Sequence, residues 1–100
     1  MSIFKTITTA VQDMDLVDSS NYSANANITI SQIKVTNHGA TGAITVSVFI
    51  DKTTGEDEYI FKTSIPQDTT LIFDDAFSYP QTETLKVTTS GNSNITIVVN

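Results

Sequence analysis

The chain contains no cysteine, no tryptophan and no arginine, and its 100 residues include only two prolines and four glycines. Without cysteine, neither a disulfide framework nor a cysteine-ligated metal centre can hold the fold together. Side-chain packing and backbone pairing must therefore supply the stability. A chain of this length suffices for one hydrophobic core and not for two, so we expect a single domain over residues 1–100.

Basic residues and long apolar runs are scarce as well. Five lysines stand against eleven acidic residues, which gives a formal net charge of −6. Because phosphate backbones are bound by Lys and Arg, this balance argues against a nucleic-acid partner. No apolar run approaches the length of a membrane span, and the N-terminal residues lack the apolar stretch of a secretory signal. We therefore expect no membrane partner, and maturation in a bacterial or host cytoplasm.

Apolar and polar residues alternate along the chain, which predicts strands, and no stretch shows the spacing of an amphipathic helix. The seventeen threonines favour the same structure, because a branched Cβ fits a pleated sheet. The predicted strands cover residues 3–9, 28–35, 44–50, 58–62, 71–73, 84–88 and 95–99. The side chains predicted to face the core from the three clearest strands are Ile44, Val46, Val48, Ile50, Leu85, Val87, Ile95, Ile97 and Val99.

One predicted strand changes the phase of its alternation. Ile28 and Ile30 have one parity, whereas Ile33 and Val35 have the other. A bulge near residues 31–32, or a strand that changes sheets, would bring both pairs to a single core.

Turn residues separate the predicted strands. Glycine, asparagine and proline recur at intervals of about ten residues, the rhythm of an antiparallel sandwich or barrel. Residues 12–25 are polar and weakly patterned, and we interpret them as a long connection with room for one irregular strand. The sequence thus predicts an all-β antiparallel sandwich of about seven or eight strands, with jelly-roll and immunoglobulin-like topologies both open.

Side chains suited to catalysis are few. The single histidine, His38, lies in a predicted turn, where histidines are usually solvated. Asp74 and Asp75, or the acids at 56–58, could supply a carboxylate pair for glycoside chemistry. Adjacent residues on a strand point to opposite faces, however, and acids beside a turn usually lie in water. The sequence therefore predicts that the protein is not an enzyme, with a small hydrolase as the weakest alternative.

Asp13, Asp15 and Asp18 stand close together in a polar segment, and a hard cation such as calcium binds closely spaced oxygen ligands. The segment lacks the glycine-punctuated loop, closed by a glutamate, that calcium sites of this kind use. The acids around the predicted hairpin at 51–57 have the same shortcoming. We predict solvated loops and no bound metal or cofactor.

Apolar residues also occur at positions that the alternation turns outward. Phe49, Ile60, Ile72 and Val98 all break the polar side of their strands. Several exposed apolar residues on neighbouring strands mark a protein interface, although loops could instead cover some of them. With Phe4 in the first strand, these are the predicted interface residues, and unpaired sheet edges offer a second route to self-association. A charge at position 49 is expected to weaken assembly and leave the domain folded.

Several strand-and-turn segments resemble small β-sandwich proteins encoded by tailed phages, especially marine and cyanobacterial ones. The segments that carry the resemblance are Phe4-Lys5-Thr6-Ile7-Thr8-Thr9, Ile33-Lys34-Val35-Thr36-Asn37 followed by Ile44-Thr45-Val46-Ser47-Val48, Tyr59-Ile60-Phe61-Lys62-Thr63-Ser64-Ile65-Pro66, and Leu85-Lys86-Val87-Thr88-Thr89-Ser90. The chain departs from that group at 66–70, where a Gly-rich turn commonly follows the proline.

Members of that group are similar to virion structural components, which include capsid decoration proteins and small parts of the neck or tail and are often multimeric. The resemblance implies a virion protein that binds the major capsid protein and copies of itself, with a neck, tail or fibre-base position as the alternative. It implies no site residues. A carbohydrate- or calcium-binding module that recognises a host surface is the alternative from another class. That function needs exposed aromatics near loops, for which Tyr22 and Tyr79 are the candidates.

Overall fold

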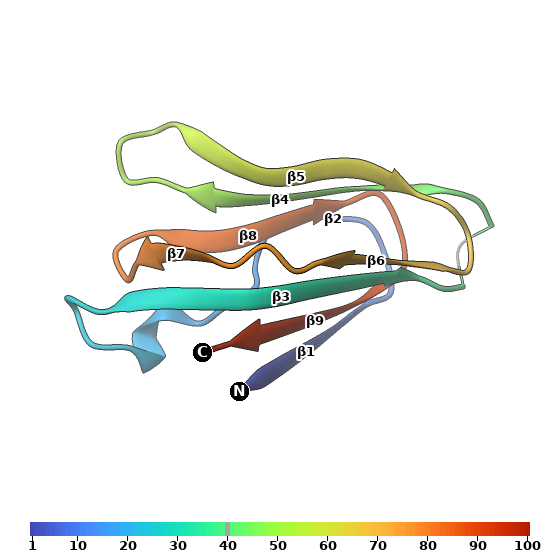
Figure 1. Cartoon of the computed structure of the whole chain (residues 1–100). Coiled ribbons are helices and arrows are strands. Elements are labelled where there is room, and N and C mark those ends of the chain that lie inside the picture. The colour runs from blue at the N-terminus through green and yellow to red at the C-terminus, as the bar shows by residue number, and fades with distance from the viewer. Residues whose placement is uncertain (40) are drawn as a thin grey trace.

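Strands dominate the computed structural model, which describes residues 1–39 and 41–100 (Figure 1). The strands are β1 Ser2–Ile7, β2 Val11–Asp15, β3 Asn27–Asn37, β4 Ile44–Asp51, β5 Asp57–Ile65, β6 Thr69–Phe73, β7 Phe77–Pro80, β8 Thr84–Thr89 and β9 Ser93–Val99. A short 3₁₀ helix, η1, covers Ser19–Asn21. In the described residues, no helix is long and apolar enough to cross a membrane. The all-β prediction is confirmed.

Two antiparallel sheets pack face to face. Sheet A has the strand order β1-β9-β3-β6, with β7 also pairing to β3, and sheet B has the order β2-β8-β4-β5. β6 pairs with residues 33–37 of β3 and β7 with residues 27–30, so the two behave as one interrupted strand. The sandwich prediction is confirmed, and the interruption explains why residues 1–39 and 41–100 form nine strands instead of eight.

The pairing order selects one topology. With β6 and β7 counted as one position, the first strand pairs with the last, the second with the last but one, and so on inward to the central hairpin of β4 and β5. An antiparallel ribbon that wraps into two sheets in this way is a jelly roll. The structure therefore has the jelly-roll topology and not the immunoglobulin-like one.

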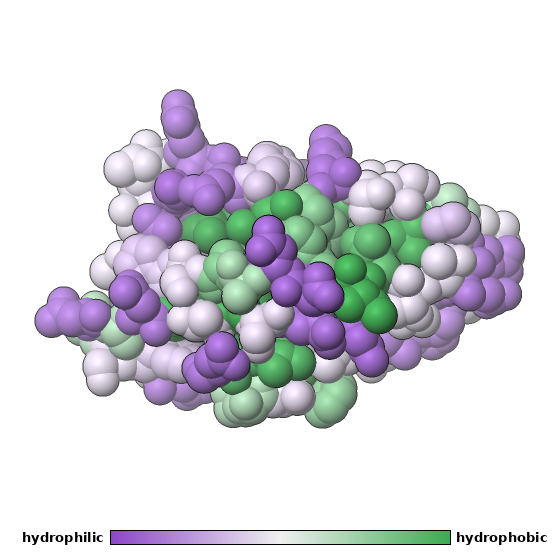
Figure 2. Space-filling model, viewed as in Figure 1, coloured by the Kyte–Doolittle hydropathy of each residue, from purple (hydrophilic) through white to green (hydrophobic). Residues whose placement is uncertain are grey.

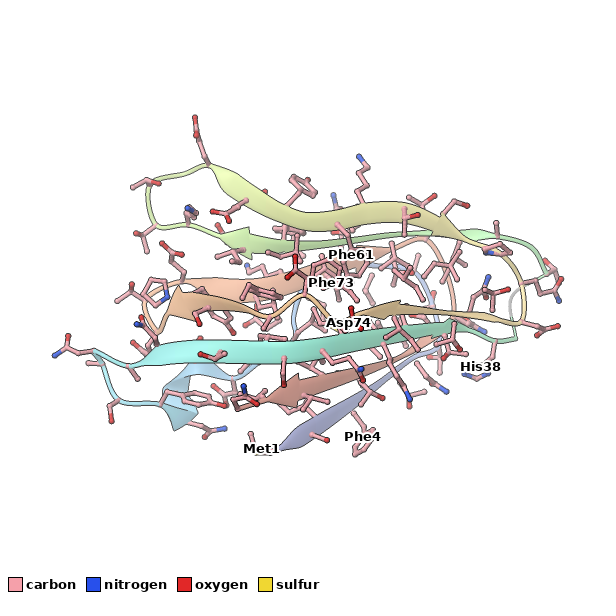
Figure 3. The ribbon with its side chains drawn as sticks, viewed as in Figure 1. Met1, Phe4, His38, Phe61, Phe73 and Asp74 are labelled. Carbon is pink, nitrogen blue, oxygen red and sulfur yellow. The ribbon has the colours of Figure 1, made fainter. Side chains whose placement is uncertain are left out.

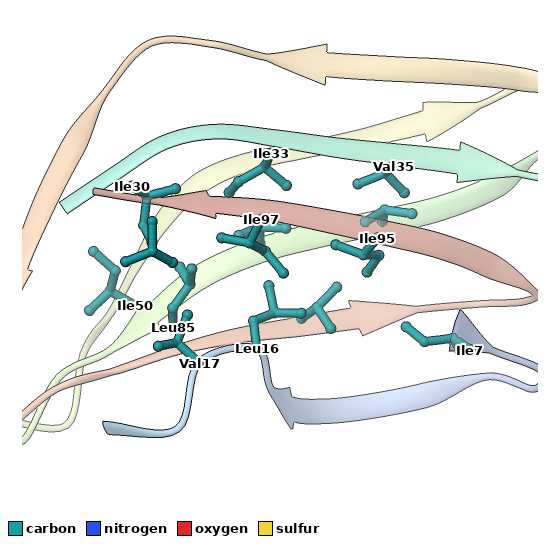
Figure 4. Packing of buried hydrophobic residues seen from close by; sticks show 14 of the residues in the cluster. Ile7, Leu16, Val17, Ile30, Ile33, Val35, Ile50, Leu85, Ile95 and Ile97 are labelled. Atoms are coloured by element: carbon teal, nitrogen blue, oxygen red, sulfur yellow. The ribbon is translucent and has the colours of Figure 1, made fainter. Parts of the chain in front are cut away.

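The hydrophobic core lies between the two sheets (Figure 4). All nine side chains predicted to face inward are buried, with at most 3% of their surface exposed. Leu16 and Val17, which follow β2, join them, and the Leu16 N–H donates to the Leu85 carbonyl at 2.8 Å. Burial of each such side chain contributes about 1.5–3 kcal/mol, so this core stabilises a chain that has no disulfide.

β3 contains the bulge that its sequence predicts. Its pairing with β9 shifts between Ile30 and Gln32, which leaves Ser31 as the extra residue. Ile30 and Ile33 are both buried as a result, although their parities differ. Along its length, the strands with which β3 pairs in the described residues all belong to sheet A. The bulge, and not a change of sheet, therefore turns both pairs of isoleucine and valine side chains toward the core.

β2 is the irregular strand for which the weakly patterned segment leaves room. Only Val11, Met14 and Asp15 pair with β8, and the register shifts between the first two. Asp13 has a φ of 54°, in the left-handed region that non-glycine residues rarely adopt. Its backbone N–H donates to the Thr88 hydroxyl at 3.1 Å instead of to a strand carbonyl.

A row of aromatic rings links β5 of sheet B to the interrupted strand of sheet A. The ring centroids of Phe61 and Phe73 are 5.5 Å apart, those of Phe73 and Phe77 6.3 Å, and those of Phe77 and Tyr79 6.5 Å. Figure 2 shows hydrophobic residues in the middle of this side of the molecule, interrupted by hydrophilic ones. Aromatic pairs at such distances contribute about 0.5–1.5 kcal/mol each beyond their burial, so the row stabilises the contact between the two sheets.

Gly91, between β8 and β9, lies against the start of β4. A Cβ at this position would stand 2.9 Å from Cγ2 of Ile44, a branched core side chain with little room to move. We expect Gly91→Ala to lower the free energy of unfolding by about 1–2 kcal/mol through overpacking. Gly42→Ala is the control, because a Cβ there meets nothing within 4 Å. Urea denaturation measures both, and equal midpoints would contradict the expectation.

Candidate interaction surface

The side chains considered for catalysis lie apart and in water. His38 is exposed between β3 and β4, and Asp74 is exposed between β6 and β7 (Figure 3). Within residues 1–39 and 41–100, no three His, Cys, Asp or Glu side chains gather closely enough to hold a metal ion. No pocket forms in this described part of the chain either. The absence of catalysis stays a prediction.

Asp13, Asp15 and Asp18 each have a different partner. Asp13 accepts a hydrogen bond from the Thr88 hydroxyl at 3.4 Å, and Asp15 lies 3.8 Å from Nζ of Lys86. Asp18 caps η1, and the hydroxyl and backbone N–H whose hydrogen bonds it accepts lower the pKa of its carboxyl. These three acids therefore serve strand pairing and a helix cap, and they do not converge on one point.

Two of the five predicted interface residues are well exposed on the outer face of sheet A. Phe4 is 75% exposed and projects from β1 (Figure 3), and Ile72 on β6 is 56% exposed. The register places them on one row across the sheet, in which Thr96 and Lys34 stand between them. Since neighbouring strands are about 4.8 Å apart, the two side chains lie at opposite edges of the face and not in one patch.

Val98 and Ile60 are only partly accessible. Val98 lies half-buried on the outer face of sheet A, opposite Ser2 and Gln32. Ile60 lies where the register between β4 and β5 shifts by one residue, and it packs partly against the core. Their part in an interface stays a prediction, and the surface that each offers is smaller than expected.

Phe49 points to the outer face of sheet B, as predicted, but it is not exposed. Only 3% of its surface is accessible, because the Tyr59 ring lies 5.3 Å away and Lys86 stands opposite on β8. Asp51, at 3.1 Å, and Asp15 hold the Lys86 amine across this face, and the hydrogen bond to Asp51 raises the pKa of that amine. The expectation of an exposed Phe49 is wrong, since cross-strand neighbours cover the ring.

Acidic residues are distributed unevenly between the two sheets. The strands of sheet A contain Lys5 and Lys34 and no Asp or Glu. The strands of sheet B contain two lysines and five acids, and the other acids lie in connecting segments. Hydroxyls and amides fill the outer face of sheet A, where the hydroxyls of Thr36 and Thr70 are 2.8 Å apart. We call this surface the acid-free face.

Sequence reasoning missed both the acid-free face and the exposure of Tyr59, which is 54% accessible. The positions of the acids were visible in the sequence, but the strands that share a sheet were not. A carbohydrate-binding module would need Tyr22 and Tyr79 at the surface. The hydroxyl of Tyr22 is buried, however, and Tyr79 is only 2% exposed. Burial raises the pKa of the Tyr79 phenol.

Comparison of the chain with family models, with curated proteins and with solved structures finds no match. The jelly-roll topology, the acid-free face and the exposed Phe4 and Ile72 are therefore the observations from which a function is argued.

Proposed function

We propose that the chain is a structural protein of a bacteriophage particle that decorates the head, where it binds the lattice of the major capsid protein. The resemblance of its segments to small virion proteins of tailed phages supports this assignment. Jelly rolls occur both in viral capsid domains and in lectins, so the surface has to decide between such roles. Of the two aromatic residues that the sequence offers for a lectin-like site, Tyr79 is buried and Tyr22 is half-buried.

The acid-free face is the observation that carries the proposal. The chain as a whole has a net charge of −6, yet the strands of this face present no carboxylate to a neighbouring protein. Burial of unpaired charge is costly, so a face of hydroxyls, amides, two exposed apolar side chains and the single charge of Lys34 is more favourable to cover than sheet B with its five acids. Sheet B and the connecting segments then keep their acids in solvent and repel other particles.

A single face of the sandwich is large enough for this role. A standard specific interface takes about 800 Å² from each partner, which is a small part of the 5449 Å² that the domain exposes. Many copies on one lattice make modest individual contacts sufficient. Added contacts between capsid subunits would resist internal pressure from the packaged genome.

Lys34, in the middle of the acid-free face, provides the direct test of the surface. Lys34→Glu brings a carboxylate into the proposed contact, and we expect it to weaken binding to undecorated particles by about tenfold. Lys62→Glu makes the same change on β5 of sheet B and should leave binding unaltered. Cosedimentation of each purified variant with particles measures the affinity. Equal affinities of the two variants would contradict a contact through sheet A.

Mass spectrometry of purified particles tests the location. A decoration protein is expected in copy numbers comparable to the major capsid protein, whereas a neck, tail or fibre-base protein would be present in a few copies. Absence of the chain from purified particles would reject the virion assignment altogether.

A further inference from the structure

With β6 and β7 counted as one, the described residues form four edge strands, and three of these carry features that hinder the addition of another strand. β2 has a register shift and the positive φ of Asp13. β5 has a bulge and the charged residues Asp57, Glu58 and Lys62. β6 and β7 are separated by a break in the strand, and β7 ends at a proline. In the part of the chain that the structure describes, β1 alone is an edge without a bulge, a break or a positive φ, and Lys5 is its one charged residue.

The backbone groups that β1 presents to solvent follow from its pairing with β9. Met1 and Val99 exchange two hydrogen bonds, of 2.7 and 2.8 Å, and the register then runs without a shift to Ile7. Bonded pairs alternate along an antiparallel ladder, so the odd-numbered residues of β1 bond to β9. The N–H and C=O groups of Ser2, Phe4 and Thr6 therefore point to the free edge.

We propose that two copies of this chain associate through β1, with the two strands antiparallel and a two-fold axis between Phe4 and its counterpart in the second copy. The five-stranded sheets A of the two copies then join into one continuous sheet. Ser2 of each copy lies opposite Thr6 of the other, and Ile3 lies opposite Lys5. The exposed Phe4 rings, each 75% accessible in the single domain, meet on the outer face.

The backbone and the side chains select the same register. Centred on Phe4, all the free groups of Ser2, Phe4 and Thr6 are paired, in about six hydrogen bonds between the copies. A pairing centred on Lys5 would place two ammonium groups directly opposite each other, and like charges in that position are destabilising. A pairing centred on Ile3 would place Phe4 opposite Ser2, so the two exposed rings would not meet. A register that places Phe4 opposite an odd-numbered residue of the other copy fails as well, because the backbone groups of the odd-numbered residues already bond to β9.

Charge favours a second copy as the occupant of this edge. Two chains of net charge −6 repel at most relative orientations, but the strands on either side of this contact contain no carboxylate. A contact of two short strands buries less than a standard interface, so the association is weak in solution and gains from a lattice that holds the copies close together. The inference stands apart from the virion proposal, because it concerns only two copies of this chain.

Cysteine cross-linking tests the register, and the chain has no cysteine of its own to confuse the result. In the proposed pairing the Cα atoms of residue 4 are about 5.5 Å apart, within the range that a disulfide spans. We expect Phe4→Cys to form covalent dimers under mild oxidation about tenfold faster than Ile72→Cys, which is also an exposed apolar position on the same row. Ser2→Cys alone should not cross-link, whereas a mixture of Ser2→Cys with Thr6→Cys should.

Sedimentation velocity at increasing protein concentration tests the association without a cross-link. We expect a monomer–dimer equilibrium that Phe4→Pro abolishes and Ile72→Asp preserves. Proline at position 4 removes an N–H that faces the free edge, so β1 keeps its bonds to β9, which circular dichroism and the melting temperature check. A protein that stays monomeric at all concentrations, a dimer that survives Phe4→Pro, or equal cross-linking at positions 4 and 72 overturns the proposal.

Discussion

Phe49→Ala is expected to lower the free energy of unfolding by about 3–5 kcal/mol, although the residue lies on the outer face of its sheet. Its ring is 3% exposed, with the Tyr59 ring 5.3 Å away and Lys86 directly opposite on β8. Truncation to alanine removes most of the buried surface and leaves Tyr59 without its partner. Urea denaturation, monitored by circular dichroism, gives the change in stability.

Ile72→Ala is the matched control for this prediction. Ile72 also points outward, but 56% of its surface is exposed, so its truncation should change stability by less than about 0.5 kcal/mol. Phe49→Asp should unfold a large part of the population, because it places a carboxylate where the ring is buried. A Phe49→Ala variant as stable as Ile72→Ala would show that the ring contributes no packing on this face.

The contrast between Phe49 and Ile72 shows what alternation along a strand can predict. Parity gave the direction of both side chains correctly, since direction depends only on position along the strand. Exposure depends on the neighbours across the sheet, and those of Phe49 come from segments about ten and forty residues away in the sequence. Without knowledge of the pairing, two outward apolar residues look alike.

Topology shows the same limit. The alternation predicted the strands over 44–50, 84–88 and 95–99 and their inward faces, and the changed parity within β3 predicted either the bulge that the structure shows or a change of sheet. β7 was not predicted, because it is only four residues long and ends at Pro80, too short to show an alternation of apolar and polar residues. The choice of a jelly roll required the pairing of strands far apart in sequence, such as β1 with β9, which local patterns do not contain.

The candidate surface was predictable in part. The sequence singled out Phe4 and Ile72, and both are exposed. It did not indicate that they share one row, nor that every strand of their sheet is free of acids, because both facts follow from the register. The acid-free face arises when strands that lack acids, dispersed along the chain, are brought into one sheet.

Asn37 ties three segments together at one end of the sandwich, and its loss should be costly. Its side chain is fully buried at the end of β3, and Nδ2 donates to the carbonyls of Gly42, at 2.9 Å, and Ile65, at 3.0 Å. The backbone carbonyl of Asn37 accepts a hydrogen bond from the Asp68 N–H at 2.9 Å. The side chain thus joins β3 to the chain before β4 and to the end of β5.

Asn37→Ala is expected to lower the free energy of unfolding by about 2–4 kcal/mol, because it removes the donor to two carbonyls that burial keeps from water. Asn94→Ala, at an exposed asparagine of β9, should change stability by less than about 0.5 kcal/mol. Comparable urea midpoints for the two variants would contradict the role assigned to Nδ2.

Asn37→Asp separates the hydrogen bond from the shape of the side chain. Burial and the two facing carbonyls disfavour the charged form, so the pKa of the new carboxyl in the folded state lies above its unfolded value of about 3.9. As the pH rises, this carboxyl loses its proton in the unfolded state before it does so in the folded state. The free energy of unfolding of the variant therefore falls between the two pKa values. We expect the stability difference from the unsubstituted chain to be smaller at pH 4 than at pH 7, in urea titrations of both proteins. A difference that does not change with pH would mean that residue 37 reaches water.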